Sequence, residues 1–226
     1  MEKTKKLVIV GDSAFAEVAY ECFTHDSEYK VVGFSVESAY LKKKELFGLP
    51  IVPFERLEDH FNPNEVEFYA ALVYSQLNRL RARLYESAKA KGYRPASYIS
   101  SRAFVWRNVE LGEHCFIFED NTVQPFVRIG NNVVLWSGNH IGHHTVIHEH
   151  CFIASHVVIS GFCEIGRNSF MGVNATLANN VIIGEDNWIG PSVTIMHNTE
   201  PNLLFSSEQT EPAKVSARRF FKLKES

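Results

Sequence analysis

From Ile99 to Ile195, every sixth residue is aliphatic or Met, which gives seventeen positions in succession without an interruption. An α-helix repeats after about 3.6 residues and a strand after about two, so neither requires a strict period of six. An uninterrupted period of six is typical of a parallel β-helix, in which each hexapeptide forms one flat side and two positions point inward. The positions are Ile99, Val105, Leu111, Ile117, Val123, Ile129, Leu135, Ile141, Ile147, Ile153, Ile159, Ile165, Met171, Leu177, Ile183, Ile189 and Ile195.

Two further columns follow the same period. The residue after the aliphatic position is often glycine, and the residue four after it is small or of medium size, as in Cys115, Thr145 and Ala175. These are the residues expected at tight corners and in a narrow interior. Three hexapeptides per coil predict coils of 18 residues, of which this segment contains roughly five.

Residues 1–95 have a different pattern, which predicts a small parallel α/β sheet because strands and helices alternate. The hydrophobic pattern predicts strands at 6–10, 29–36 and 68–74, an extended segment at 46–54, and helices at 14–25 and 77–91. We therefore expect three parts: an α/β domain at 1–95, a β-helix at 96–204, and a polar, Pro-containing cap or packing arm at 205–226. A cap is expected because a solenoid must cover its open end.

The first predicted strand runs into the sequence GDSAFAE, a strand-to-helix turn. This is either a plain turn or a helix N-terminus whose N–H groups face a phosphate or a nucleotide base. Ser13 and Ala16 stand where a dinucleotide fingerprint has glycines, so no redox cofactor is expected.

Composition excludes several classes. The net charge of −3 gives no reason to expect nucleic acid or an anionic membrane as a partner. No apolar run approaches the ~18 residues of a membrane span, and the start of the chain lacks a signal-peptide core, so a cytoplasmic protein is expected. Cys115, Cys151 and Cys163 fall in the interior column and Cys22 in a predicted helix, which favours reduced thiols.

Six of the ten histidines lie between His140 and His156. His143 falls at an outward corner, with Gly161 one coil later and Pro125 one coil earlier. A neutral imidazole can take a proton from an attacking amine or hydroxyl, and an unobstructed N–H at Gly161 can stabilise an oxyanion. This pair suits acyl transfer. Candidates for orienting the imidazole are Asn139, Glu149 and Asp120.

Zinc is the competing interpretation. His143 and His148 form an H-x4-H pair that resembles the γ-class carbonic anhydrases, which are β-helices. Catalytic zinc needs three protein ligands, and the columns that would supply the third hold Pro125 and Arg107. No metal is therefore expected.

The string VLWSGNHIGHHTVIHEHCFIASHVVISGFCEIG, with SFMGVNATLANNVIIGEDNWIG after it, resembles the left-handed β-helix acyltransferases. The match is closest to sugar-nucleotide acetyltransferases of the bacillosamine, perosamine and sialic-acid branches. Their layout, a Rossmann-like domain followed by a left-handed β-helix of hexapeptide repeats, covers essentially the whole chain. The resemblance implies a homotrimer with active sites between subunits, acetyl-CoA as co-substrate and a nucleotide-linked sugar in the N-terminal domain.

The resemblance also implies roles for particular residues. The general base falls on His143 and the thioester-contacting amide on Gly161. Apart from the resemblance, His144 and Asn139 are expected as supporting residues because they stand beside His143 in the sequence. Coenzyme A contacts fall near Val173, Asn174 and Pro191, besides Gly161. The nucleotide-sugar contacts fall on Gly11, Asp12, Ser13, Ala14, Ser35, Tyr74, Asn78 and Arg81. Bacillosamine members carry Glu after the catalytic His, where this chain has His144, and an acidic pair where this chain has Ser35 and Glu37.

The resulting expectation is an acetyl-CoA-dependent N-acetyltransferase acting on a nucleotide-linked amino sugar, of the 4-amino-4,6-dideoxyhexose type, in surface-glycan (lipopolysaccharide O-antigen) biosynthesis. A sugar O-acetyltransferase of the sialic-acid type, a zinc protein like the γ-carbonic anhydrases and a catalytically silent trimeric scaffold stay open as alternatives.

Overall fold

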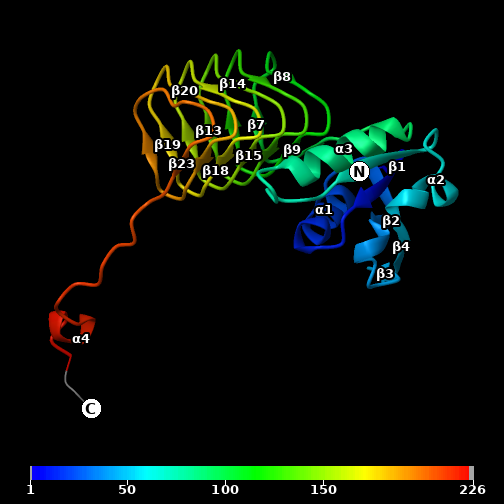
Figure 1. The fold of residues 1–226 in the computed structure, drawn as a ribbon, viewed down its shortest axis with the longest axis horizontal. Helices are drawn as coiled ribbons and strands as arrows, with labels where there is room; N and C mark the ends of the chain where they lie inside the picture. Colours follow the sequence, from blue (N-terminus) through cyan, green and yellow to red (C-terminus); the bar gives the residue numbers. More distant parts are fainter. Residues whose placement is uncertain (1, 224–226) are drawn as a thin grey trace.

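The computed structural model describes residues 2–223, and it consists of an α/β part followed by a stack of parallel coils (Figure 1). The two parts lie side by side, with α1 (Ala14–His25) and α3 (Arg79–Ala90) next to the first coils. A short tail leaves the far end of the stack.

A five-stranded sheet forms the centre of the α/β part, with the strand order β3-β4-β2-β1-β5. Only β3 and β4 are antiparallel neighbours. Leu7, Val8 and Ile9 of the inner strand β1 have no exposed surface, as expected for a strand covered on both faces. The strands are β1 (Lys5–Val10), β2 (Tyr29–Val36), β3 (Glu45–Leu46), β4 (Leu49–Pro53) and β5 (Val66–Ala70); the short helices are η1 (Ser38–Tyr40), η2 (Phe54–Arg56) and α2 (Leu57–His60).

The predicted helix at 14–25 and strand at 29–36 are confirmed at both ends. The predicted strand at 68–74 is too long, because β5 ends at Ala70. The predicted helix at 77–91 begins later, at Arg79, since Gln76, Leu77 and Asn78 have φ values of 54°, 51° and 67°. Three successive residues with positive φ cannot be part of a right-handed helix.

The coils form a left-handed parallel β-helix with three sheets, as the period of six predicts. Each hexapeptide contributes one two-residue strand, which pairs with strands 18 residues away, as Thr122 does with His140 and His140 with Val158. The six-stranded sheet contains β7 (Phe104–Val105), β10 (Thr122–Val123), β13 (His140–Ile141), β16 (Val158–Ile159), β19 (Thr176–Leu177) and β22 (Thr194–Ile195). The five-stranded sheet contains β8 (Glu110–Leu111), β11 (Arg128–Ile129), β14 (Val146–Ile147), β17 (Glu164–Ile165) and β20 (Ile182–Ile183). The seven-stranded sheet contains β6 (Tyr98–Ile99), β9 (Phe116–Ile117), β12 (Val134–Leu135), β15 (Phe152–Ile153), β18 (Phe170–Met171), β21 (Trp188–Ile189) and β23 (Leu204–Phe205).

The aliphatic column fills the interior of the β-helix. From Ile117 to Ile195 every member of the column is at most 6% exposed. Cys115, Cys151 and Cys163 are buried beside this column as free thiols, which confirms the sequence interpretation. Burial raises the pKa of the Cys151 thiol to about 12, so it packs as a small apolar group.

The corners of the β-helix explain part of the histidine cluster. One residue per hexapeptide has a positive φ, between 56° and 65° for the non-glycine residues from His114 to Ser192. Asn, Asp and His tolerate this left-handed conformation better than most residues. His144, His150 and His156 occupy such positions. The backbone therefore favours half of the clustered histidines regardless of any chemistry.

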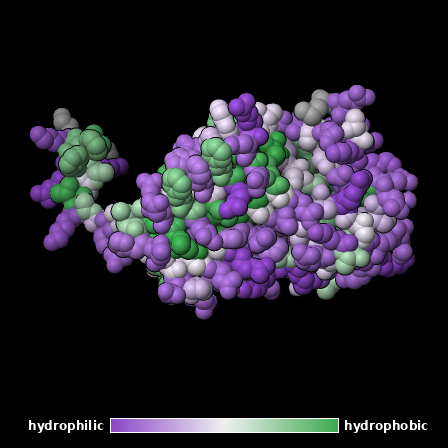
Figure 2. All heavy atoms as spheres, turned by 90° about the horizontal axis from the view of Figure 1, so that it is seen from above, coloured by the Kyte–Doolittle hydropathy of each residue, from purple (hydrophilic) through white to green (hydrophobic). Residues whose placement is uncertain are grey.

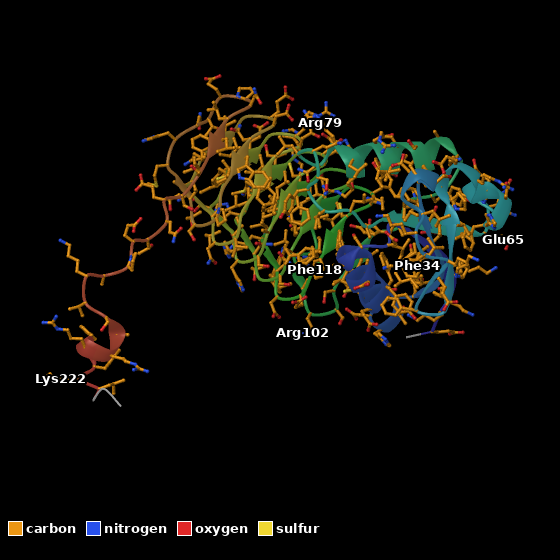
Figure 3. The ribbon with its side chains drawn as sticks, turned by 60° about the horizontal axis from the view of Figure 1, so that its bottom comes forward. Phe34, Glu65, Arg79, Arg102, Phe118 and Lys222 are labelled. Carbon is orange, nitrogen blue, oxygen red and sulfur yellow. The ribbon has the colours of Figure 1, made fainter. Side chains whose placement is uncertain are left out.

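The two parts of the chain share an aromatic core. Phe15 of α1 packs against Phe116 and Phe118 on the outer face of the seven-stranded sheet, with ring centroids 5.4 and 6.3 Å apart. Figure 3 shows Phe118 beside α1. This contact fixes the α/β part against the first coils of the β-helix.

The chain leaves the β-helix after β23, which pairs with β21. Residues 206–223 are exposed and contain only a short helix, α4 (Ala217–Phe220). Figure 2 shows this tail separated from the body of the molecule. Within one chain, residues 206–223 therefore do not form the expected cap, and only β23 covers part of the last coil; residues 224–226 lie outside the described range.

Candidate functional site

His143 and Gly161 lie next to each other on successive coils, directly after β13 and β16. A Cβ atom on Gly161 would lie 2.8 Å from Cε1 of His143, so the imidazole rests against the bare Cα of the glycine. Any side chain at position 161 would displace the ring. The sequence period therefore predicted this neighbourhood correctly.

Two further contacts hold His143. Its main-chain N–H donates to Oε1 of Gln124 at 2.9 Å, and its Nδ1 lies 3.1 Å from Nδ1 of His144. Within residues 2–223, its Nε2 has no hydrogen-bond partner, and the side chain is exposed. This leaves one ring nitrogen open towards solvent, as a general base requires.

The Gly161 N–H was expected to be unobstructed, but in the structure it is hydrogen-bonded. It donates to Oδ1 of Asn179 at 3.0 Å, one coil further on, so it is not free. Asn179 is exposed, and its side chain must rotate away before this N–H can donate to a substrate oxygen. The sequence did not show this because the amide of Asn179 reaches back across a coil.

None of Asn139, Glu149 and Asp120 makes a hydrogen bond to His143 among the described residues. Asn139 is buried, donates to the Trp136 carbonyl at 2.6 Å and accepts from the Val157 N–H at 2.8 Å. Its amide is therefore part of the β-helix interior, which contradicts a role beside the imidazole. Asp120 pairs instead with Arg102 at 3.1 Å.

A cavity of about 240 Å³ lies at the carboxyl ends of β1 and β2; we call it the strand-end cavity. Gly11, Asp12, Ser13 and Ser35 line it, and Ala14 follows as the first residue of α1. Ser35 is fully buried, and its hydroxyl has no hydrogen-bond partner in the described structure. The carboxyl ends of parallel strands are where open α/β sheets bind ligands. Four of the predicted nucleotide-side residues are therefore brought together. The lining also includes Tyr40, Leu72 and Leu80.

Asn78 and Arg81 are not part of this cavity, which contradicts their predicted contact with a nucleotide. Asn78 is buried and donates to the Asn168 carbonyl at 2.8 Å. Arg81 is also buried, and its guanidinium donates to Oδ1 of Asn132 at 3.0 Å and to the His150 carbonyl at 3.0 Å. Desolvation lowers the pKa of Arg81 to about 10. Both side chains connect the α/β part to the β-helix.

A second cavity, of about 340 Å³, lies on the outer face of the seven-stranded sheet. Tyr74, Val173 and Pro191 line it with the rings of Trp136, Phe152, Phe170 and Trp188; we call it the aromatic cavity. Tyr74 therefore lies with two residues predicted to contact coenzyme A, rather than in the strand-end cavity. Asn174, at a left-handed corner with a φ of 60°, is next to Val173 but does not line the cavity.

A polar network that the sequence analysis did not predict joins the two parts of the chain. Nε2 of His114 accepts from the Ala70 N–H at 2.8 Å, and its Nδ1 donates to Oδ1 of Asn132 at 3.0 Å. The Asn132 amide then donates to Nδ1 of His150 at 2.9 Å. Desolvation lowers the pKa of His114 to about 3 and that of His150 to about 4, so both stay neutral.

Within residues 2–223, no group of three or more His, Cys, Asp or Glu side chains is placed to hold a metal ion. Across the same range, no helix is both long and apolar enough to span a membrane.

Comparison with known proteins agrees with this fold. Residues 144–179 match the family model of the bacterial transferase hexapeptide (six repeats). No curated protein sequence matches the chain significantly. Among solved structures, the acetyltransferase domain of PglB from Neisseria gonorrhoeae superimposes with a TM-score of 0.81 at 18% identity, covering 93% of this chain and 100% of that chain.

Two further structures are similar. A histidine-to-asparagine mutant of perosamine N-acetyltransferase from Caulobacter crescentus, in complex with CoA and GDP-perosamine, gives a TM-score of 0.78 at 20% identity and covers 89% of this chain and 93% of that one. WeeI from Acinetobacter baumannii gives 0.70 at 15% identity, with 90% and 97% covered. The chain thus consists of an α/β domain followed by a left-handed β-helix of hexapeptide repeats. This is the architecture of the solved PglB domain and perosamine N-acetyltransferase.

Proposed function

We propose that this chain is an acetyl-CoA-dependent N-acetyltransferase that acts on the amino group of a nucleotide-linked amino sugar. The observation that carries the proposal is the exposed imidazole of His143, with Nε2 open and Gly161 directly beneath it. The similarity in fold to structures that contain CoA and GDP-perosamine, or acetyl coenzyme A, supports the choice of substrates.

The reaction follows from these groups. Nε2 of His143 takes a proton from the sugar amine as the amine nitrogen attacks the thioester carbonyl, an effect worth about 10²–10⁴-fold. The N–H of Gly161, once Asn179 has rotated away, donates to the developing oxyanion. The C–S bond then breaks, and the sulfur of the leaving thiol takes the proton from His143. An amine and a thioester give an amide and a thiol.

The two cavities suit the two substrates. The strand-end cavity offers main-chain groups of the turn at Gly11–Ser13 and the unpaired hydroxyl of Ser35 to a nucleotide. The aromatic cavity offers an apolar surface that includes Val173 and Pro191 to coenzyme A. The sugar substrate that we propose is a 4-amino-4,6-dideoxyhexose linked to a nucleoside diphosphate. Its acetylated product would be a donor for surface-glycan assembly.

We also propose a homotrimer. His143 follows the six-stranded sheet, whereas the aromatic cavity lies on the seven-stranded sheet, so one chain presents them on different faces. Phe104, Trp106, Phe126 and Phe162 are each at least 40% exposed, all on or beside the six-stranded sheet. Clustered exposed rings are typical of a protein interface. Analytical ultracentrifugation tests the assembly, and a monomer at assay concentration would contradict it.

The direct test is turnover with a panel of UDP-, dTDP- and GDP-linked 4-amino-4,6-dideoxyhexoses and acetyl-CoA, with thiol release as the readout. Matched sugar nucleotides with a hydroxyl at the same carbon are the control. We expect thiol release with at least one amine and none with its hydroxyl counterpart. Activity confined to hydroxylated sugars would instead favour the O-acetyltransferase.

A further inference from the structure

The orientation of His143 depends on an unusual neighbour. The only side-chain hydrogen bond to its ring in residues 2–223 comes from His144, with 3.1 Å between the two Nδ1 atoms and ring planes at 89°. One imidazole must donate its Nδ1–H and the other must accept, because two protonated nitrogens, or two unprotonated ones, cannot form this bond. No carboxylate contacts either ring in the described structure.

Although His144 is exposed, stacking contacts on both faces hold its ring in place. Its ring lies between Phe126 and Phe162, one coil earlier and one coil later, with both centroid distances at 4.7 Å and interplanar angles of 25° and 16°. The three residues occupy one corner column, with φ values of 65°, 60° and 60° for Phe126, His144 and Phe162. The two phenyl rings cover both faces of the imidazole, so rotation of the His144 side chain would break two stacking contacts.

Phe162 also restricts His143. It meets the catalytic ring edge to face at 5.0 Å and 87°, while Gly161 lies beneath the same ring. Once the aromatic stack fixes His144, the position of its Nδ1 determines where Nδ1 of His143 can lie. Nε2 then points away from the corner.

We propose that His144 is a positioning residue whose Nδ1 accepts the Nδ1–H of His143, so that Nε2 of His143 is the unprotonated nitrogen that faces the substrate. This deepens the proposed function, on which it rests, by naming the group that sets the tautomer of the base. A neutral, stacked imidazole performs this role here without a carboxylate. The opposite donor assignment would leave His143 protonated at Nε2 and unable to act as a base.

The corner column supplies matched variants. Phe is accommodated at this φ in Phe126 and Phe162, so His144→Phe keeps the stack and removes only the acceptor. Asn is accommodated at the same column in Asn180, and its Oδ1 takes nearly the place of an imidazole Nδ1, so His144→Asn restores the acceptor. We expect His144→Phe to lower kcat by roughly 10–100-fold with KM nearly unchanged, and His144→Asn to recover most of that loss.

A readout independent of substrate separates this proposal from the proposed function. Long-range ¹H–¹⁵N correlation spectra report which ring nitrogen of each histidine carries the proton. We expect the unmodified protein to show His143 protonated at Nδ1, and the His144→Phe variant to show a mixture of tautomers. His143 protonated at Nε2 in the unmodified protein, or full kcat in His144→Phe, would overturn the positioning role. Absence of turnover by the unmodified protein with every amino sugar would instead overturn the proposed function, and the tautomer result would still stand.

Discussion

Two pairs of histidines in this molecule form hydrogen bonds through Nδ1, but the pairs differ in their location and in how the two rings are connected. His114 and His150 lie at the junction of the α/β part and the β-helix, bridged by the amide of Asn132. His143 and His144 lie at an exposed corner and contact each other directly. The first pair connects the two parts of the chain through hydrogen bonds, whereas in the second pair Nε2 of His143 has no hydrogen-bond partner among the described residues.

The hydrogen bonds explain the difference. Nε2 of His114 accepts from the Ala70 N–H, so its Nδ1 must carry the proton that is donated to Asn132. The amide nitrogen of Asn132 then fixes Nδ1 of His150 as an acceptor. Burial favours the neutral form of both rings. His114 therefore supports the fold with both ring nitrogens hydrogen-bonded, whereas His143 keeps one nitrogen free for chemistry.

The largest expected effect is on catalysis at the exposed pair. His143→Ala removes the proposed base and should lower kcat by about 10²–10⁴-fold while the unfolding midpoint stays near that of the unmodified protein. His156→Ala is the matched control, since His156 is another exposed corner histidine whose ring lies against a glycine, Gly138. Equal activity of the His143 variant and the control would remove His143 as the base.

The next effect is on stability at the buried pair. Arg81 donates both to Oδ1 of Asn132 and to the His150 carbonyl, so Arg81→Met removes one of the two donors to Asn132 and the donor to the His150 carbonyl. We expect the free energy of unfolding to fall by about 3 kcal/mol or more. Arg79→Met, on the same helix, breaks the half-exposed pair with Asp186 and a 3.4 Å hydrogen bond to the Leu77 carbonyl, which together should cost less than about 1 kcal/mol. Denaturant unfolding curves measure both, and similar losses for the two variants would contradict the assignment.

The buried pair should also make stability depend on pH. The unfolded chain protonates His114 and His150 near pH 6.5, while the folded chain resists protonation until about pH 3 and 4. The unfolded state thus binds more protons, so stability is fully present above pH 6.5 and falls as pH decreases below it. The slope is about 1.4 kcal/mol per pH unit for each proton. Unfolding midpoints between pH 7 and 4.5 test this, and His114→Gln should reduce the slope.

These two regions also show how far the sequence could predict the molecule. The β-helix was predictable because its period is local: from Ile117 on, each hexapeptide buries its own aliphatic residue, and the pairing of residues 18 apart follows directly. The same 18-residue spacing correctly predicted that His143 lies beside Gly161. The strand and helix at Tyr29–Val36 and Ala14–His25 were also predictable from their own hydrophobic patterns.

What failed depends on contacts between distant segments. The family resemblance implied that Arg81 contacts the nucleotide, yet its side chain is buried, which is rare for a charged residue. Its acceptors, Asn132 and His150, are 51 and 69 residues away, so the sequence could not reveal them. Asn139 failed for a different reason: it stands four residues after Leu135, in the interior column, where main-chain groups of the β-helix satisfy its amide.

A smaller effect is expected at the glycine beneath the base. In Gly161→Ala the new Cβ would lie 2.8 Å from Cε1 of His143, so the ring must move while the backbone stays. We expect kcat to fall roughly 10–100-fold, with an unchanged unfolding midpoint. Asn179→Ala is the matched control, because it frees the Gly161 N–H without placing an atom against the His143 ring. We expect no fall in kcat for this variant. A large loss in Asn179→Ala would mean that the side-chain amide, rather than the main-chain N–H, serves the reaction.

The smallest effect concerns the tail, which contributes to neither pair of histidines. Residues 208–223 are exposed and bury nothing against the β-helix of their own chain, whereas Leu204 and Phe205 still pair with β21. We therefore expect truncation after Ser207 to leave the unfolding midpoint of the monomeric chain unchanged. The position of His143 should also stay the same. Truncation before Leu204 removes β23 and should lower the midpoint, because the Gly190 N–H then loses its hydrogen bond to the Phe205 carbonyl. If removal of residues 208–226 alone lowers the midpoint in a concentration-dependent way, the tail caps a neighbouring chain in the assembly instead of its own.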